Sequence, residues 1–217
     1  MILTVRNMLV AGGILTGFAL LGGGLVVITY YQTKDRIAAN ERAVLLASLN
    51  TLVPPERYDN ALAEDKLQVT DPELLGTPEP VTLYRAYKDG QPVAVLATLV
   101  APDGYSGAIR LLVGVYADGT LAGVRVLAHH ETPGLGDPIE LDRSDWILSF
   151  TGKSLGNPEP QWWAVKKDGG VFDQFTGATI TPRAVVKAVR QFLIYFQTHR
   201  EPLFATLGTA KPESQRD

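Results

Sequence analysis

Uncharged residues fill the first part of the chain. No charged side chain occurs from Asn7 to Thr33, and the run from Met8 to Tyr31 is almost wholly apolar. A helix that spans a bilayer needs roughly 20 apolar residues, so this pattern predicts an N-terminal membrane anchor over residues 1–33. A cleaved signal peptide is the alternative, but its apolar core would extend for only about 7–15 residues before a small-residue cleavage site. The longer run favours an uncleaved anchor.

The charges that flank this segment leave its orientation open. Only Arg6 and the amino terminus precede it, whereas Lys34, Arg36 and Arg42 follow it. Cytoplasmic loops usually carry the excess of Lys and Arg, so this count does not favour export of the C-terminal part.

Residues 34–80 connect the anchor to the first strand-like segment. A helix is predicted over residues 34–52, with Leu45, Leu49 and Leu52 on one stripe, and Pro54 and the proline after it end the helix. Residues 53–80 are rich in proline and charge, and we expect them to link the following domain or wrap around it.

Alternation of apolar and polar residues then predicts an antiparallel meander. Two Asp-Gly pairs, at Asp89 and Asp118, fall between runs rich in β-forming residues, and this combination is typical of hairpins. The expected strands are 81–87, 93–100, 109–116 and 121–127, with a further short strand at 162–165 and loops with short helix at 137–155.

The clearest helix of the domain is predicted from Pro182 to Thr198. Thr181 would be its N-cap, the proline would occupy the first turn, and apolar residues recur along one face. Strands followed by helices indicate an α+β domain over residues 81–200. The polar tail, residues 201–217, is expected to be disordered.

Composition narrows the chemistry. The net charge is −3, which gives no electrostatic argument for nucleic-acid binding. The chain of 217 residues has no cysteine, which excludes disulfides, thiolate catalysis and cysteine-ligated clusters. Its 3 histidines have no spacing that suggests a metal site. Redox chemistry would therefore need an organic cofactor.

A small-residue loop leads directly into the predicted helix. Its sequence is Asp-Gln-Phe-Thr-Gly-Ala-Thr, residues 173–179, followed by Ile-Thr-Pro. The amides and the dipole of the helix N-terminus favour an anion beside Thr179, and a phosphate fits there. Taken alone, such a segment is more often a simple turn and helix cap.

This segment matches the flavinylation motif Asp-x-x-Ser/Thr-Gly-Ala-Thr at every specified position. It resembles the FMN-binding domain shared by the G subunit of the Rnf/Rsx electron-transport complex and the C subunit of the sodium-translocating NADH:quinone reductase. The chain length, the Thr-Pro pair and the final helix resemble the Rnf/Rsx protein more closely. The resemblance implies FMN bound covalently through its phosphate to Thr179. The matching positions are Asp173, Thr176, Gly177, Ala178 and Thr179.

The resemblance also implies how the flavin is attached. A separate flavin transferase forms the phosphoester, and Asp173 is thought to help that enzyme recognise the motif. A threonine hydroxyl is a poor nucleophile without a base, and no base is adjacent to Thr179 in the sequence, which agrees with an external enzyme. Thr181 is the alternative acceptor, but its expected role is the N-cap.

A second segment, residues 129–136, resembles the Glu-Thr-Pro-Gly-Leu-Gly loop of the same domain, which lies against the flavin. Without the resemblance it would be a turn after a strand. The implied cofactor-binding residues are Glu131, Thr132 and Leu135, through backbone amides and through packing of the leucine on the ring.

Several nearby side chains receive no firm assignment. His129 and His130, just before this loop, are hypothesised as proton donors. Of Trp162 and its neighbour Trp163, at most one would flank the ring, because adjacent residues of a strand point to opposite faces. Lys166 and Lys167 are more typical of solvated lysines than of a phosphate site, and Tyr105 has no role.

The resemblance implies a membrane-anchored flavoprotein subunit that relays electrons in an ion-translocating complex and is not a catalyst alone. It implies a single-pass protein of the bacterial inner membrane with a periplasmic flavin domain and other membrane subunits as partners. No Gly-x-Gly-x-x-Gly follows a strand, so no nicotinamide site is expected. The C subunit of the sodium-translocating reductase and a non-redox exported binding or assembly module remain alternatives.

Overall fold

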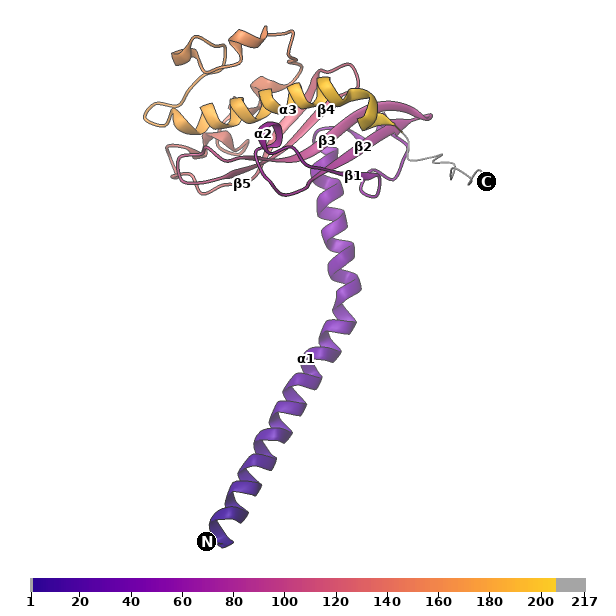
Figure 1. Cartoon of the computed structure of the whole chain (residues 1–217), viewed down its shortest axis with the longest axis vertical. Coiled ribbons are helices and arrows are strands. Elements are labelled where there is room, and N and C mark those ends of the chain that lie inside the picture. The colour runs from indigo at the N-terminus through magenta and orange to yellow at the C-terminus, as the bar shows by residue number, and fades with distance from the viewer. Residues whose placement is uncertain (1, 206–217) are drawn as a thin grey trace, which may run out of the picture. The chain divides into compact units, whose positions relative to one another are not determined.

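The computed structural model describes residues 2–205, apart from the side chains of residues 2–11, 14, 28, 31, 32, 35, 37 and 38 (Figure 1). The chain divides into two compact units at Leu45 and Leu46. Helix α1 (Ile2–Asn50) runs through the predicted anchor and the predicted helix that follows it. No helix in the described part of the chain combines the length and the apolarity that a membrane span needs.

The second unit is built on a five-stranded antiparallel sheet in which every strand pairs with its neighbours in sequence. The predicted α+β domain with an antiparallel meander is therefore confirmed. The first strand was not predicted, because its alternation extends over only four residues within a segment rich in proline and charge. The strands are β1 (Lys66–Val69), β2 (Val81–Lys88), β3 (Gln91–Ala101), β4 (Ile109–Tyr116) and β5 (Leu121–Ala128).

Local chemistry explains the two predicted turns. Asp89 and Gly90 both have positive φ, at 50° and 73°, which matches the twist that a two-residue hairpin loop requires. In the turn between β4 and β5, the Asp118 carboxylate accepts hydrogen bonds from the Thr120 amide at 2.9 Å and the Thr120 hydroxyl at 2.7 Å. Gly119 then takes a φ of 91°.

Helix α3 (Ile180–Phe204) lies across one face of the sheet (Figure 1). Its apolar side packs on the strands and forms the main core with Val185, Val189 and Phe192, each fully buried. The helix continues past the predicted end at Thr198, with a kink at His199, where φ is −116° and ψ is 15°. Residues 201–204 of the predicted disordered tail are helical, so that part of the prediction was wrong, and the residues from 206 onward lie outside the described part.

Short 3₁₀ turns and one short helix fill the connections. They are η1 (Pro55–Arg57), α2 (Pro72–Leu75), η2 (Asp137–Ile139), η3 (Asp145–Phe150), η4 (Pro160–Trp162) and η5 (Lys166–Asp168). The strand expected at 162–165 is wrong, because Trp162 ends a 3₁₀ turn and only Val165 forms an isolated bridge, with Phe172. Trp163 is buried beside Phe172, with ring centroids 5.1 Å apart.

A smaller core covers the other face of the sheet. Leu49, Leu52 and Val53 are buried there. Leu52 lies over Gly114 and Gly123, which are cross-strand partners. A Cβ atom on Gly123 would lie 2.9 Å from Leu52 Cδ2, so the absence of a side chain makes room for the leucine.

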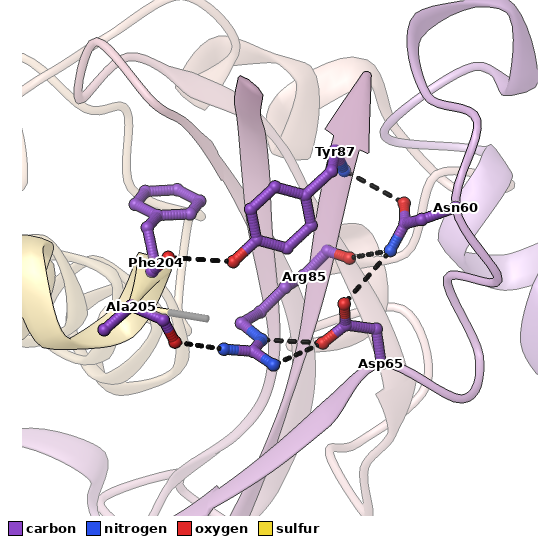
Figure 2. A network of polar contacts seen from close by, with 6 residues as sticks. All are labelled: Asn60, Asp65, Arg85, Tyr87, Phe204 and Ala205. Atoms are coloured by element: carbon purple, nitrogen blue, oxygen red, sulfur yellow. Dashed lines mark hydrogen bonds and ion pairs between the residues drawn. The ribbon is translucent and has the colours of Figure 1, made fainter. Parts of the chain in front are cut away.

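A polar network ties the end of α3 to β2 (Figure 2). The Arg85 guanidinium forms an ion pair with Asp65 at 2.6 Å and donates to the Ala205 carbonyl at 3.0 Å. The Tyr87 hydroxyl donates to the Phe204 carbonyl at 3.1 Å. These bonds satisfy carbonyl groups that a helix C-terminus leaves without intrahelical partners.

Candidate functional site

A tight turn delivers the motif threonine to the start of α3. The Ala178 amide donates to the Phe175 carbonyl at 3.1 Å, and Gly177 inside this turn has a φ of +80°. A side chain at that position would be strained, which explains the glycine. Thr179 follows at the N-cap position and is half-buried, but its hydroxyl does not cap the helix.

Thr181 is not the N-cap, so that prediction was wrong. It lies inside the first turn of α3, is 0% exposed, and donates its hydroxyl proton to the Glu131 carboxylate. The helix begins at Ile180, earlier than the position of Pro182 suggested. The Thr181 hydroxyl is therefore free to bond with Glu131, which is 50 residues away in the sequence. The two threonines of the segment therefore have different environments.

Glu131 joins three segments of the site. Its side chain is buried, at 4% exposed, and one carboxylate oxygen accepts from the Ser106 amide at 3.0 Å while the other accepts from Thr181. Two glycines leave room for it. A Cβ on Gly136 would lie 2.9 Å from Glu131 Oε2, and one on Gly104 would lie 3.0 Å from Glu131 Oε1. Such a buried carboxylate is tolerated only with hydrogen-bond donors of this kind.

A pocket of about 200 Å³ lies where these segments meet. Most of the residues proposed from the two motifs line it, although the two motifs are far apart in the sequence. Asp173 and Thr176 are exposed and do not belong to the lining. The lining residues are Tyr105, Glu131, Thr132, Leu135, Gly136, Gly177, Ala178, Thr179, Ile180 and Thr181.

The loop that contains Leu135 is closed by its own hydrogen bonds. The amides of Leu135 and Gly136 both donate to the Thr132 carbonyl, at 3.1 and 3.0 Å. The expected bond from the Leu135 amide to a flavin is therefore not available in this conformation. The Leu135 side chain is 47% exposed and faces Gly177, because a Cβ on that glycine would lie 3.8 Å from Leu135 Cδ2.

The two histidines lie outside the pocket lining. His129 Nδ1 accepts from the Glu131 amide at 3.0 Å, and its Nε2 lies 2.9 Å from Glu140 Oε1. Because Nδ1 accepts a hydrogen bond, the ring proton is assigned to Nε2, which donates to Glu140. His129 therefore holds the loop in place through these two bonds. His130 is exposed.

Charged residues around the motif are held in ion pairs. Lys166 pairs with Asp173 at 2.5 Å, and Arg183 makes two hydrogen bonds to Asp168, at 2.5 and 2.6 Å. The bonds from Arg183 hold the pKa of Asp168 below its usual range, and the pKa of Arg183 is raised by the same bonds. In this structure the Lys166 ammonium group therefore lies on the motif's own aspartate.

A second hollow of about 200 Å³ lies between the β4–β5 turn and the C-terminal half of α3. It contains none of the residues proposed from the motifs. The pKa of Asp118 beside it is lowered, mainly by the hydrogen bond from the Thr120 hydroxyl. Asp118 thus has a structural partner in its own turn.

Tyr105 is the pocket residue that sequence reasoning missed. It is 69% exposed and belongs to the loop between β3 and β4. The signal available in the sequence was an aromatic residue in a loop between Gly104 and Gly107, where a large ring has no core to enter.

Two protein-family models match this chain, one in its N-terminal part and one in the domain that contains the pocket. A family model described as FMN-binding domain matches residues 104–194, and one described as RnfG N-terminal region matches residues 1–52. The chain is 53% identical over 202 residues to the G subunit of the ion-translocating oxidoreductase complex of Pseudomonas aeruginosa, a match that covers 93% of this chain and 94% of that protein. The protein of the same name from Pseudoalteromonas atlantica is 49% identical with the same coverage, and that from Shewanella baltica is 46% identical over 93% of this chain and 95% of the relative.

Proposed function

The chain belongs to the G-subunit family of the ion-translocating oxidoreductase complex, and from this premise we propose that it is a flavoprotein subunit that relays electrons through FMN bound covalently to Thr179. One observation carries the attachment site. The Thr179 hydroxyl does not cap α3 and the residue lines the pocket, whereas the Thr181 hydroxyl is buried and donated to Glu131.

The residues present fit a phosphoester at this position. The first amides of a helix have no intrahelical acceptor, and the helix dipole favours negative charge there. Pro182 lies among these first residues, where its missing N–H costs little. Gly177 and Ala178 are the smallest residues and leave space beside Thr179. These features suit a phosphate and do not require a metal ion.

The same geometry supports attachment by a separate flavin transferase. Among the described residues, Glu131 is the one carboxylate in the pocket lining, and it already accepts from Ser106 and Thr181. It is therefore not positioned to serve as a free base for Thr179. Asp173 and Thr176 are exposed beside the attachment site, so a second protein can reach them for recognition.

Bound FMN would supply the electron-transfer chemistry, and the residues of this chain would bind and orient it. The Leu135 side chain is a large apolar group placed to contact a ring, and the Glu131 carboxylate of the same segment accepts hydrogen bonds from Ser106 and Thr181. Thr132 contributes its carbonyl to the turn that fixes Leu135.

We further propose that the protein works in the bacterial inner membrane with other membrane subunits. The uncharged run before Lys34 and the match to the RnfG N-terminal region support an anchor over residues 1–33. The large apolar side chains of α1 that the structure describes between Leu15 and Tyr30 are exposed, which suits contact with lipid. We propose that the flavin domain lies on the periplasmic side, which is the side that the family resemblance implies. Cleavage of this domain by protease added to intact spheroplasts is the expected result, and protection until lysis would reverse the assignment.

Intact mass tests the attachment. The full chain co-expressed with a flavin transferase is expected to gain the mass of one FMN less one water. Thr179→Ala is expected to lose this gain, and Thr198→Ala, an exposed threonine of α3, to keep it. No gain in the wild-type chain, with a transferase that modifies another substrate, would refute the proposal. A flavin that attaches but cannot be reduced within the complex would instead support a non-redox module.

A further inference from the structure

We propose that Tyr105 is a flavin-contacting residue whose aromatic ring forms a wall of the cofactor pocket. This inference rests on the proposed function, because it takes FMN on Thr179 as the ligand. It adds a third segment, the loop between β3 and β4, to the two motif segments that the sequence indicated.

The loop that carries Tyr105 is fixed on both sides of the ring. On one side Asp103 pairs with Lys187 of α3 at 2.6 Å, and on the other the Ser106 amide donates to the buried Glu131 carboxylate. Gly104 packs so closely that a Cβ atom there would lie 2.1 Å from the Gly107 carbonyl oxygen. Tyr105 is therefore presented on a constrained loop.

The ring itself does little for the fold. Tyr105 is 69% exposed, and among the residues that the structure describes it has no hydrogen bond and no ring contact. Covering a large exposed aromatic surface with a ligand removes it from water, and this stabilises the complex. Leu135 and Ile180, both of which line the same pocket, are also exposed, at 47% and 45%. These three side chains form an apolar rim that suits a flat, largely apolar ring.

Charge near the rim points to the same class of ligand. The acidic and basic side chains on either side are already paired, Asp103 with Lys187 and Asp168 with Arg183. The rim is thus left for apolar contact, while the helix N-terminus at Thr179 receives the phosphate. This division matches a molecule with an aromatic ring at one end and a phosphate at the other.

Fluorescence of the bound flavin reports contact with Tyr105 directly. A phenol touching an excited flavin quenches its emission by lending it an electron, which then returns to the phenol, so no net reaction occurs. We expect weak emission per bound FMN in the full wild-type chain. Tyr105→Phe and Tyr105→Leu should give a several-fold gain in emission, whereas Tyr105→Trp should remain quenched because indole is also an electron donor.

A matched control separates contact from a general effect. Tyr116→Phe removes the same hydroxyl at the far end of β4 and should leave the emission unchanged. FMN content of every variant is measured by mass, so loss of attachment and loss of quenching are distinguished. Equal emission from the wild-type chain and Tyr105→Phe, both fully flavinylated, would overturn the inference. If the wild-type chain takes no covalent FMN, the proposed attachment is wrong. The wild-type chain and the same variants are then compared for how strongly they quench the emission of added free FMN. Equal quenching by the wild-type chain and Tyr105→Phe would overturn the contact.

Discussion

Substitutions of the two threonines at the start of α3 should have different effects, one on flavin attachment and the other on the stability of the fold. Replacing either by valine keeps its shape and removes only the hydroxyl group. Thr181→Val removes the donor to Glu131 at a position that is 0% exposed. Thr179→Val changes a half-buried residue whose hydroxyl does not cap the helix. The first change should destabilise the fold, and the second should abolish flavin attachment.

The magnitude follows from the environment of Glu131. Thr181→Val leaves one carboxylate oxygen buried without that donor, and hydrogen bonds to charged groups contribute about 1.5–3 kcal/mol. The residue is too deeply buried for water to replace the donor easily, so we expect a loss of about 2–3 kcal/mol in the free energy of unfolding. Thr179→Val should stay within about 0.5 kcal/mol of the wild-type chain.

Urea denaturation of the full chain, expressed without a transferase, measures the effect on stability. Fluorescence of the buried Trp146 and Trp163 follows unfolding of the domain. Intact mass after co-expression with the transferase measures attachment. A change below about 0.5 kcal/mol in Thr181→Val would refute the role given to the Glu131 bond. FMN on Thr181 in the Thr179→Val variant would show that this threonine is accessible, against the buried geometry.

A double-mutant cycle tests whether the effect acts through Glu131. Adding Thr181→Val to Glu131→Ala should cost far less than Thr181→Val alone, since the acceptor is already gone. The coupling between the two residues is expected to exceed about 1 kcal/mol. Additive effects would mean that the hydroxyl stabilises the domain in some other way.

Three further predictions concern stability. Gly136→Ala should cost about 1–3 kcal/mol in urea denaturation, because the new methyl would press on the buried carboxylate, whereas Gly156→Ala, which meets nothing closer than 4.0 Å, should be neutral. Asp65→Ala should cost about 3 kcal/mol by leaving the buried Arg85 without its ion pair, and a loss below about 1 kcal/mol, the value of a surface pair, would contradict this. Asp168→Asn should lower the melting temperature at pH 7 but not near pH 2. The pKa of Asp168 is lowered in the folded state, so its carboxylate stabilises the fold above the unfolded pKa, and this effect is lost as the pH falls through the folded pKa. An equal change in melting temperature at both pH values would refute the prediction.

The sequence by itself determined the features that depend on neighbouring residues. Alternation and the Asp89-Gly90 pair specify hairpins because a strand's side chains alternate and a two-residue turn needs positive φ. These signals indicated β2 to β5 within a few residues. The segment Gly177-Ala178-Thr179 also indicated a turn into a helix with a candidate phosphate site, since this too is local geometry.

Only the tertiary structure decided how distant residues divide their roles. β1 is a strand because β2 pairs with it, and four alternating residues are too short a signal to predict a strand on their own. The Thr181 hydroxyl donates to Glu131, 50 residues away, whereas the hydroxyl of the nearby Thr179 makes no capping hydrogen bond. Tyr105 reaches the pocket because a third loop is tied to that same carboxylate. Burial and hydrogen-bond satisfaction arise when segments pack together, so no local pattern records which of two similar residues is enclosed.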